Sequence, residues 1–535
     1  MRPDVRLRDL QRPDSEPLFE VTESSLKPLP AAFSIAGPEK NWKPLTEHIR
    51  ATCECGLDNT CAVNLPRPST LQEEYELVDR FLSGLEKLFT KENNWAFLQP
   101  LLLTMEHCTG CQTCAESCHI FESSGRAEPY RPTFRSEVLR RLYFKHVRGG
   151  GLLSRLQHGD IELNWPLIAR LAELSYRCNL CRRCAQSCPI GADNALVTHE
   201  LRKLFSQEMG IAAKELHERG SMLQLKVGSS TGMTPRVVRD NIEFIDDDTS
   251  EKTGIPVKTP WDVEGADVLL IHNAGEILAW PENPGAFALI LNAAGIKWTM
   301  SSELVGYDSI NYGLWYDDAQ FARVAVRHAE VARKLKVKKI VIGECGHAHK
   351  ALGVIADRLL TGDLNIPRES SLTLLRDIVL SGRLNLDPAR NDFPITLHDP
   401  CNLVRLMGVV QPQREILRRI APRFREMTPH GVHNYCCGGG SGFAIMSPNN
   451  FGDWRAKVSG RKKLEQIVNA FSDCLADSGP KYVCAPCSNC KGQIRDLFVY
   501  HDVWKKFRIS YGGLAELIVN AMHDVRPGFI DWEWH

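Results

Sequence analysis

Thirteen of the nineteen cysteines fall into three groups whose spacing is typical of metal binding. Two groups have the pattern C-x2-C-x2-C-x3-C, and their members are Cys108, Cys111, Cys114 and Cys118, and Cys178, Cys181, Cys184 and Cys188. The third group lies far downstream and contains Cys401, the adjacent pair Cys436 and Cys437, and then Cys487 and Cys490. Thiolates at this density are the ligands of iron–sulfur clusters. The cysteines therefore predict a protein that transfers electrons.

The first two groups have the spacing of ferredoxin motifs. Three thiolates of one loop bind three irons of a cubane cluster, and the fourth ligand comes from the other motif. This rule predicts two cubane [4Fe–4S] clusters with the ligand sets Cys108, Cys111, Cys114 and Cys188, and Cys118, Cys178, Cys181 and Cys184. The alternative metal is zinc, but zinc ribbons use two C-x2-C pairs and fit two runs of four cysteines poorly.

Composition and charge exclude several other classes of function. The 65 basic and 65 acidic residues cancel, which offers no reason to expect nucleic-acid binding or direct electrostatic membrane binding. The N-terminus lacks the apolar core of a secretory signal, and no apolar run approaches the ~20 residues of a membrane helix. We therefore expect a soluble cytoplasmic protein with reduced cysteines, which a partner subunit anchors if it works at a membrane.

The segments around the two ferredoxin motifs are expected to be helical. The stretches "SEVLRRLYFKHV" and "WPLIARLAELSYR" lie between the motifs and have helical apolar spacing. Residues 101–220 are therefore predicted to form an all-helical ferredoxin domain with two [4Fe–4S] clusters. Residues 1–100 are interpreted as a partly helical N-terminal extension, and residues 221–260 as a linker.

Beyond the linker, short apolar runs alternate with helical patterns, which is typical of parallel α/β units. The alternation occurs twice, over residues 261–390 and 391–535, and predicts two related halves. In the second half the five cysteines follow three predicted strands, at the sheet edge where open α/β folds bind ligands. The first half has a single cysteine at these places, Cys345, and is expected to have lost its cluster. The predicted fold class is α+α/β.

Five thiolates exceed the four that a cubane cluster needs. Adjacent cysteines such as Cys436 and Cys437 cannot easily occupy two corners of one cubane face, but they can bind neighbouring irons of a more open cluster. The glycine-rich run over residues 438–442 favours a close backbone approach to such a cluster. Cys484 forms a competing C-x2-C pair with Cys487.

Three segments of the last half resemble the CCG domain of heterodisulfide reductases: "HDPCNLVR", "NYCCGGGSG" and "PCSNC". The resemblance implies a non-cubane [4Fe–4S] cluster held by the five downstream cysteines in residues 391–535, after a degenerate CCG half over residues 261–390. The order of modules is similar to the heterodisulfide-reductase D-type subunit. With the tail "DWEWH", it is most similar to the DsrK type, the catalytic iron–sulfur subunit of the membrane complex that partners dissimilatory sulfite reductase. Two departures from the family pattern are Asn402, where relatives often have His, and the long gap between Cys437 and Cys487.

The resemblance also implies a function and partners. The expected activity is that of an oxidoreductase acting on sulfur groups, which exchanges electrons between membrane subunits and a sulfur substrate. The implied partners are a haem-bearing, quinol-linked membrane subunit and a small sulfur-carrier protein whose C-terminal cysteines hold a disulfide or trisulfide. The protein would then lie on the inner face of the cytoplasmic membrane. His398 and Asp399 precede Cys401 and are candidates to supply protons; the alternative is a structural role at the end of a strand.

Two other functions stay open at this point. The chain could be a quinone-linked electron relay, like the iron–sulfur subunits of complexes that oxidise glycerol-3-phosphate, lactate or glycolate. Alternatively, the clusters could only stabilise the fold. The direction of electron flow and the roles of Cys53, Cys55 and Cys61 are not determined by the sequence.

Overall fold

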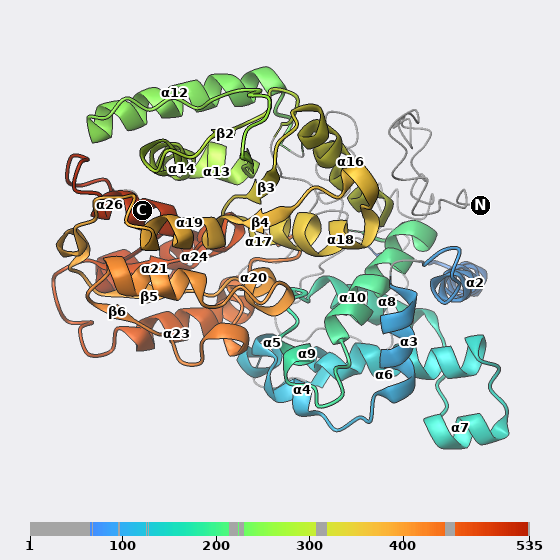
Figure 1. Cartoon of the computed structure of the whole chain (residues 1–535). Helices are drawn as coiled ribbons and strands as arrows, with labels where there is room; N and C mark the ends of the chain where they lie inside the picture. The colour runs from blue at the N-terminus through green and yellow to red at the C-terminus, as the bar shows by residue number, and fades with distance from the viewer. Residues whose placement is uncertain are drawn as a thin grey trace.

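The computed structural model describes residues 65–532, except 67, 95–96, 125, 127, 213–222, 224–228, 230, 306–317 and 444–454. The chain forms a helical N-terminal part and an α/β C-terminal part (Figure 1). Cys53, Cys55 and Cys61 lie outside the described residues. Among the helices of the described ranges, none has the length and apolar character needed to cross a membrane.

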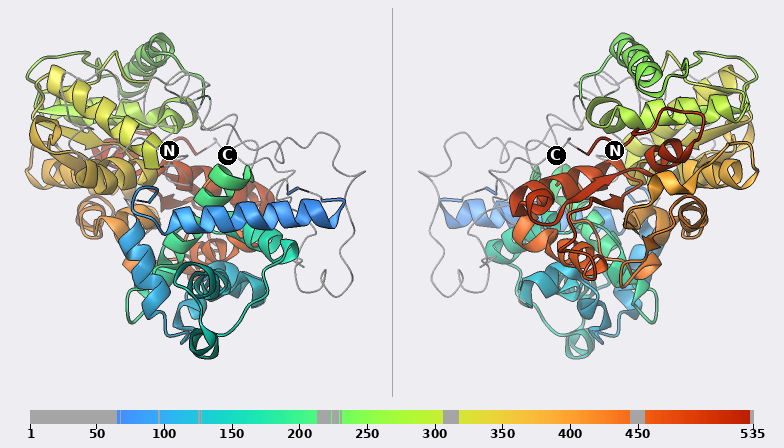
Figure 2. Two further views of the ribbon diagram at one scale, coloured as in Figure 1. Left: turned by 90° about the vertical axis from the view of Figure 1, so that its right-hand side faces the viewer. Right: turned by 90° about the vertical axis from the view of Figure 1, so that its left-hand side faces the viewer.

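The N-terminal part is built from helices, as its apolar spacing predicts. Its helices and helical turns are α2 (Leu71–Leu88), α3 (Leu98–His107), α4 (Thr113–Glu116), α5 (His119–Ser123), η5 (Glu128–Tyr130), α6 (Pro132–Leu142), η6 (Tyr143–Val147), α7 (Leu152–His158), α8 (Trp165–Tyr176), α9 (Arg183–Gln186), α10 (Asn194–Leu204) and η7 (Phe205–Met209). The side chains of Asn164 and Asp193 cap α8 and α10 by accepting hydrogen bonds from backbone N–H groups in the first turn of each helix. α2, α8 and α10 pack around Phe81, Leu171 and Leu201, and Figure 2 (left) shows α2 in blue along the outer face.

The two ferredoxin motifs have the same local backbone. Gln112 (φ 64°) precedes α4 and Arg182 (φ 60°) precedes α9, and both residues are left-handed. This turn places the third cysteine of each motif, Cys114 or Cys184, in a four-residue helix. A left-handed conformation costs a non-glycine residue roughly 1–2 kcal/mol, so the surrounding structure must hold both turns. Because α4 and α9 contact each other, the two motifs lie side by side.

The C-terminal part contains two four-stranded parallel sheets. The first has the order β2-β1-β3-β4 and the second β6-β5-β7-β8. Their strands are β1 (Val268–Ile271), β2 (Trp298–Thr299), β3 (Lys339–Ile342), β4 (Arg368–Ser370), β5 (Ile395–Leu397), β6 (Phe424–Arg425), β7 (Lys481–Cys484) and β8 (Ile509–Gly512). Both sheets thus have the same spatial order of strands, as duplication of one unit would give; the duplication itself stays a prediction.

Helices of the two halves pack against each other. The remaining elements are α12 (Pro235–Thr253), α13 (Ala274–Ala279), α14 (Glu282–Ala293), α16 (Asp318–Lys334), α17 (Gly346–Ala348), η9 (His349–Ile355), α18 (Ala356–Leu359), η10 (Gly362–Leu364), α19 (Ser371–Leu380), η11 (Pro388–Asn391), α20 (Cys401–Leu406), α21 (Pro412–Ile420), η12 (Gly431–His433), η13 (Arg455–Ser459), α23 (Arg461–Ala470), α24 (Ser488–His501), α25 (Val503–Phe507) and α26 (Leu514–Ala521). α14 of the first half contacts α26 of the second, and α19 contacts α21. One core therefore joins Leu270 and Leu372 with Leu397 and Ile518.

The structure contains several elements that were not expected from the sequence, among them α12 and two edge strands. Within the expected linker, α12 is capped by Thr234 and buries Val238, Ile242 and Ile245 at helical spacing. It packs on α14, at the top of Figure 1. The edge strands β4 and β8 are also additional. β4 is only three residues long and its sequence, Arg-Glu-Ser, is polar, so no apolar run marks it as a strand.

Candidate metal centre

Three neighbouring strands of the second sheet position the five downstream cysteines. Cys401 begins α20 after β5, and the pair Cys436–Cys437 follows β6 and η12. Cys487 caps α24 after β7, and Cys490 lies in the first turn of that helix. Since β6, β5 and β7 are adjacent in the sheet, the three loops meet at its carboxyl edge.

The five sulfurs form one contiguous group. Cys436 makes side-chain contacts with Cys401 and Cys437. Cys437 contacts Cys490, and Cys490 contacts Cys487. Cys401 is half-buried and the other four are buried, and all five are free thiols. The structure thus brings together every cysteine of the predicted third group.

Backbone N–H groups point at three of these sulfurs. Gly438 and Gly439 donate to the sulfurs of Cys436 and Cys437, both at 3.4 Å. The N–H of Gly346, from the first half, lies 3.3 Å from the sulfur of Cys487. Such hydrogen bonds stabilise thiolates and raise the potential of a cluster that they bind. The first half therefore contributes a donor to the site even though it lacks the cysteines.

Gly438 could not be replaced without moving the loop. Its φ is +89°, and a Cβ atom would lie 2.4 Å from the carbonyl oxygen of Ser459. Glycine is thus required both for the dihedral angle and for the close approach of two backbones.

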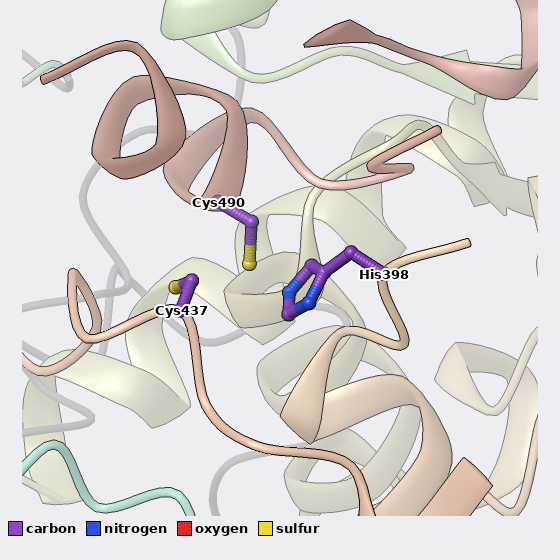
Figure 3. A group of neighbouring side chains, drawn as sticks. All are labelled: His398, Cys437 and Cys490. Carbon is purple, nitrogen blue, oxygen red and sulfur yellow. The ribbon is translucent and has the colours of Figure 1, made fainter. Parts of the chain in front are cut away.

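His398 belongs to the same site, whereas Asp399 has a structural role. The nitrogens of His398 and the sulfurs of Cys437 and Cys490 offer ligand atoms within 4.8 Å of one another (Figure 3). Burial lowers the pKa of His398, which favours the neutral imidazole. Burial opposes ionisation of Asp399, but the guanidinium of Arg414, at 2.7 and 2.8 Å from its two oxygens, holds its pKa below the ordinary value. The structure favours a structural role for Asp399 over proton supply.

The eight ferredoxin cysteines form two sets that each combine both motifs. Burial raises the pKa of Cys114 to about 11, and the neighbouring thiols of Cys108 and Cys188 act in the same direction; Cys111 is also near. Burial likewise raises the pKa of Cys118 to about 12, and its thiol neighbours are Cys181 and Cys178. Cys184 has the same two neighbours and also Cys118. The neighbours of each thiol are those that the crossed ligand pattern requires.

Burial differs between the two ferredoxin sets. Cys111, in the first set, is exposed to solvent. The cysteines of the second set, Cys118, Cys178, Cys181 and Cys184, are all half-buried and line a partly open cavity. The first set therefore lies nearest to solvent, and the second lies between it and the downstream cysteines.

The second ferredoxin set and the downstream group meet directly. The Cys181 thiol is in hydrogen-bonding contact with Cys436. Next to it, the side-chain amide of Asn179 donates to the Gly438 carbonyl at 3.0 Å, and Ser459 donates to the Asn179 oxygen at 3.1 Å. Arg405 donates to the Cys181 carbonyl at 2.8 Å. These bonds fix the two cysteine loops to each other.

A fully buried arginine adds to this connection. Arg202 of α10 donates to the carbonyl oxygens of Ser175 at 2.8 Å and Cys178 at 2.7 Å. It also donates to the carbonyl of Ser441, in the glycine-rich run, at 3.2 Å. The run expected to approach a cluster is thus bound to the loop of the second ferredoxin set.

Two further cysteines lie near the site without joining it. Cys345 is buried beside Cys487, and the Asn489 amide lies 3.8 Å from its sulfur and 2.7 Å from the Nδ1 atom of His347. Cys484 lies within β7, near the charged groups of Glu344, Glu516 and Lys491. It packs in the core of the two sheets, whereas Cys487 and Cys490 pack with the cysteine pair. The arrangement favours Cys487 and Cys490 over Cys484 as ligands.

The donor set of the site fits iron–sulfur clusters. Every predicted ligand group consists of free thiols that lie near one another, and thiolates are the usual ligands of such clusters. A single ion bound by His398, Cys437 and Cys490 is the alternative. That arrangement would use two of the five contiguous sulfurs and leave the other three without a metal.

Sequence reasoning missed the residues that join the two parts. Asn179 lies inside the second motif, directly after Cys178. A polar residue between ligand cysteines could have indicated a hydrogen bond to a neighbouring loop. Arg202 and Arg405 are single arginines on helices, and their partners lie 239 and 224 residues away. No local pattern in the sequence marks such residues.

Comparison with known proteins agrees with this geometry. Residues 104–192 match the 4Fe-4S dicluster domain, and residues 395–495 match the cysteine-rich domain named CCG. An Hdr-like menaquinol oxidoreductase iron-sulfur subunit 2 of Archaeoglobus fulgidus is 26% identical over an alignment of 482 residues, which covers 81% of each chain. The D-type subunit of the dihydromethanophenazine:CoB–CoM heterodisulfide reductase of Methanosarcina acetivorans is 25% identical over 388 residues, 71% of this chain and 87% of that protein. No solved structure matches the chain.

These matches support a CCG-type iron–sulfur protein that is similar to heterodisulfide-reductase-like oxidoreductase subunits. They also support [4Fe–4S] clusters as its cofactors.

Proposed function

We propose that this protein is the catalytic iron–sulfur subunit of a membrane-associated, heterodisulfide-reductase-like complex of the DsrK type. Its substrate is a disulfide or trisulfide on the C-terminal cysteines of a small sulfur-carrier protein. Its electron partner is a haem-bearing membrane subunit linked to the quinone pool, on the inner face of the cytoplasmic membrane. The observation that carries the proposal is the contiguous group of five sulfurs, four buried and one half-buried, in contact with the second ferredoxin set.

The thiol neighbours described above support the ligand sets of this proposal. Two cubane [4Fe–4S] clusters bind the crossed sets described above, and a non-cubane [4Fe–4S] cluster binds Cys401, Cys436, Cys437, Cys487 and Cys490. When bound, the clusters supply one-electron carriers, and the third supplies a metal site with affinity for sulfur. Cleavage of a disulfide consumes two electrons and two protons and gives two thiols.

Individual residues indicate where the electron partner, the substrate and a proton would be placed. Exposed Cys111 marks the side on which the electron partner docks, and the contact between Cys181 and Cys436 marks the passage to the catalytic site. Half-buried Cys401 marks the side from which a substrate sulfur approaches. Asn434 donates from its Nδ2 atom toward Nδ1 of His398 at 3.4 Å, which leaves the imidazole proton on Nε2. We assign to His398 the role of holding this proton beside Cys437 and Cys490.

One observation favours a second function. Two relatives from Archaeoglobus are named menaquinol oxidoreductase iron-sulfur subunits, and they match over most of both chains. The alternative function is therefore an electron relay between a quinone-linked complex and another redox protein, without a sulfur substrate.

Two measurements on anaerobically purified full-length protein separate these functions. We expect about twelve irons per chain from three [4Fe–4S] centres, and an EPR signal of the oxidised protein that changes when a thiol is added. We also expect the reduced protein to cleave the trisulfide of a purified sulfur carrier. About eight irons with no thiol-responsive signal would contradict the catalytic proposal. Electron transfer to a quinone analogue, without any reaction of the carrier, would favour the relay.

A further inference from the structure

A buried lysine lies behind the cysteine pair of the catalytic site. Lys463, near the start of α23, has a fully buried side chain. Its ammonium donates to the side-chain oxygen of Asn434 at 2.8 Å and to that of Gln466, and it lies 3.6 Å from the sulfur of Met427. All three partners are neutral, so these contacts satisfy the hydrogen-bond donors but do not balance the charge.

No carboxylate within the described ranges pairs with Lys463. The carboxylate with the strongest electrostatic effect on it is that of Asp399, whose two oxygens are already bound by Arg414. Lys491, which is equally buried, differs because it pairs with Glu516 at 3.2 Å. An isolated charge is costly to bury, and buried charges in proteins are normally paired. Lys463 therefore needs an anion that none of its direct protein partners supplies.

The remaining anionic neighbours of Lys463 are the thiolates of the catalytic site. Burial lowers the pKa of Lys463 to about 7, while Asp399 and the thiolates of Cys437, Cys436 and Cys490 act in the opposite direction. Asn434 links the lysine to the site, because its amide donates to the Asp399 carbonyl at 3.1 Å and toward His398. Asn434 also lies two residues before Cys436.

We propose that Lys463 is the counter-charge of the non-cubane cluster and a positioning residue for the cysteine pair. Its ammonium balances the negative charge of the thiolate-bound cluster and favours the reduced form, which carries one more negative charge. The charge around a cluster is one of the factors that set its reduction potential. This inference rests on the third cluster of the proposed function but not on the identity of the sulfur substrate.

The test is an EPR-monitored redox titration of full-length variants. Lys463→Met removes the charge and keeps the length of the side chain, whereas Lys463→Arg keeps the charge. Lys462→Met is the matched control, because Lys462 is the adjacent residue on α23 and pairs at the surface with Glu122 at 2.8 Å. We expect Lys463→Met to lower the midpoint potential of the thiol-responsive centre by about 59 mV, a tenfold change for a one-electron couple. Lys463→Arg should recover most of the potential, and Lys462→Met should leave it unchanged.

The potential, rather than stability, distinguishes this role from a purely structural one. Lys463→Met also removes the hydrogen bonds to Asn434 and Gln466, so it should lower the free energy of unfolding whatever the role of the charge. The midpoint potential and its recovery by Lys463→Arg report on the charge, which a purely structural lysine would not affect. An unchanged potential, or a lowered potential that Lys463→Arg does not recover, would overturn the inference. A wild-type protein without the third cluster would overturn both proposals. A third cluster whose EPR signal does not change when a thiol is added would overturn only the catalytic function.

Discussion

At the scale of single residues, the identity of the ligand after β7 can be tested by two serine substitutions three positions apart. Cys487 contacts Cys490, while Cys484 is buried within the strand near Glu344. We expect Cys487→Ser to abolish the thiol-responsive EPR signal and to reduce the iron content from about twelve to about eight per chain. Cys484→Ser should keep both. Iron loss in the Cys484 variant alone would reverse the assignment of these ligands.

Asn179 leads to a second prediction at this scale. Its side chain bonds the Gly438 carbonyl, Ser459 and the Nε2 atom of His119 at 2.8–3.1 Å. Asn179→Ala leaves these buried groups without partners. We therefore expect the free energy of unfolding, measured by denaturant titration, to fall by about 1–3 kcal/mol. Electron transfer from the cubanes to the third centre should slow as well. Asn469→Ala is the control, since Asn469 is exposed on α23 and its replacement should change stability by less than about 0.5 kcal/mol.

The sequence predicts the ligands of the site better than the residues that support them. Ligand spacing is a local property, so the cysteine motifs alone indicate three groups. The contacts of Lys463, Asn179 and Arg202 depend on tertiary packing across the two parts of the chain. Their partners could not be identified from one sequence, because neither charge nor polarity distinguishes them from other residues of the same type.

At the scale of elements, the loop after Cys437 depends on one glycine. Both Gly438 and Gly382 have a positive φ, but only at Gly438 would a Cβ atom meet backbone, whereas Gly382 has nothing within 4 Å. Gly382→Ala should therefore cost only the dihedral strain, roughly 1–2 kcal/mol in thermal or denaturant unfolding. Gly438→Ala should in addition displace Cys436 and Cys437 and remove about four irons, while the cubane signals remain. Equal effects of the two substitutions on iron content would contradict this loop geometry.

Most elements follow from local patterns, and the exceptions have physical reasons. The long helices and the central strands carry apolar residues at their characteristic periods. The fold class and the alternation of strands and helices can therefore be predicted from the sequence. The edge strand β4 forms because it pairs with β3, not because its own residues favour a strand. α12 has a Thr-Pro start and a helical stripe, but its acidic run "DDDTSEKT" has the composition of a linker.

At the scale of the whole molecule, cluster removal should affect the two parts differently. The helices that present the ferredoxin cysteines, α4, α5 and α9, have only four or five residues and are too short to be stable alone. The α/β part has two sheets and a shared core. After anaerobic chelation of iron, we expect amide hydrogen exchange to rise strongly over residues 104–192 and much less in β5 and β7.

Reconstitution is the control for this experiment. Refilling the clusters should restore the original protection over residues 104–192, which separates cluster loss from irreversible damage. Equal loss of protection in both parts would mean that the α/β part has no stability of its own, and it would contradict a stabilising role for the shared core of the two sheets.

The exposure of Cys111 has a practical consequence. Of the thirteen cysteines in the three groups, Cys111 alone is exposed, so dioxygen reaches the thiolates and irons of its set before the others. Protein handled in air should therefore lose iron first from the proposed cluster that contains Cys111, while the proposed third centre persists. Such a preparation would contain about eight irons and be inactive with a physiological donor, yet it would still respond to thiols. An iron count must accordingly be accompanied by a spectrum that identifies which centre is missing.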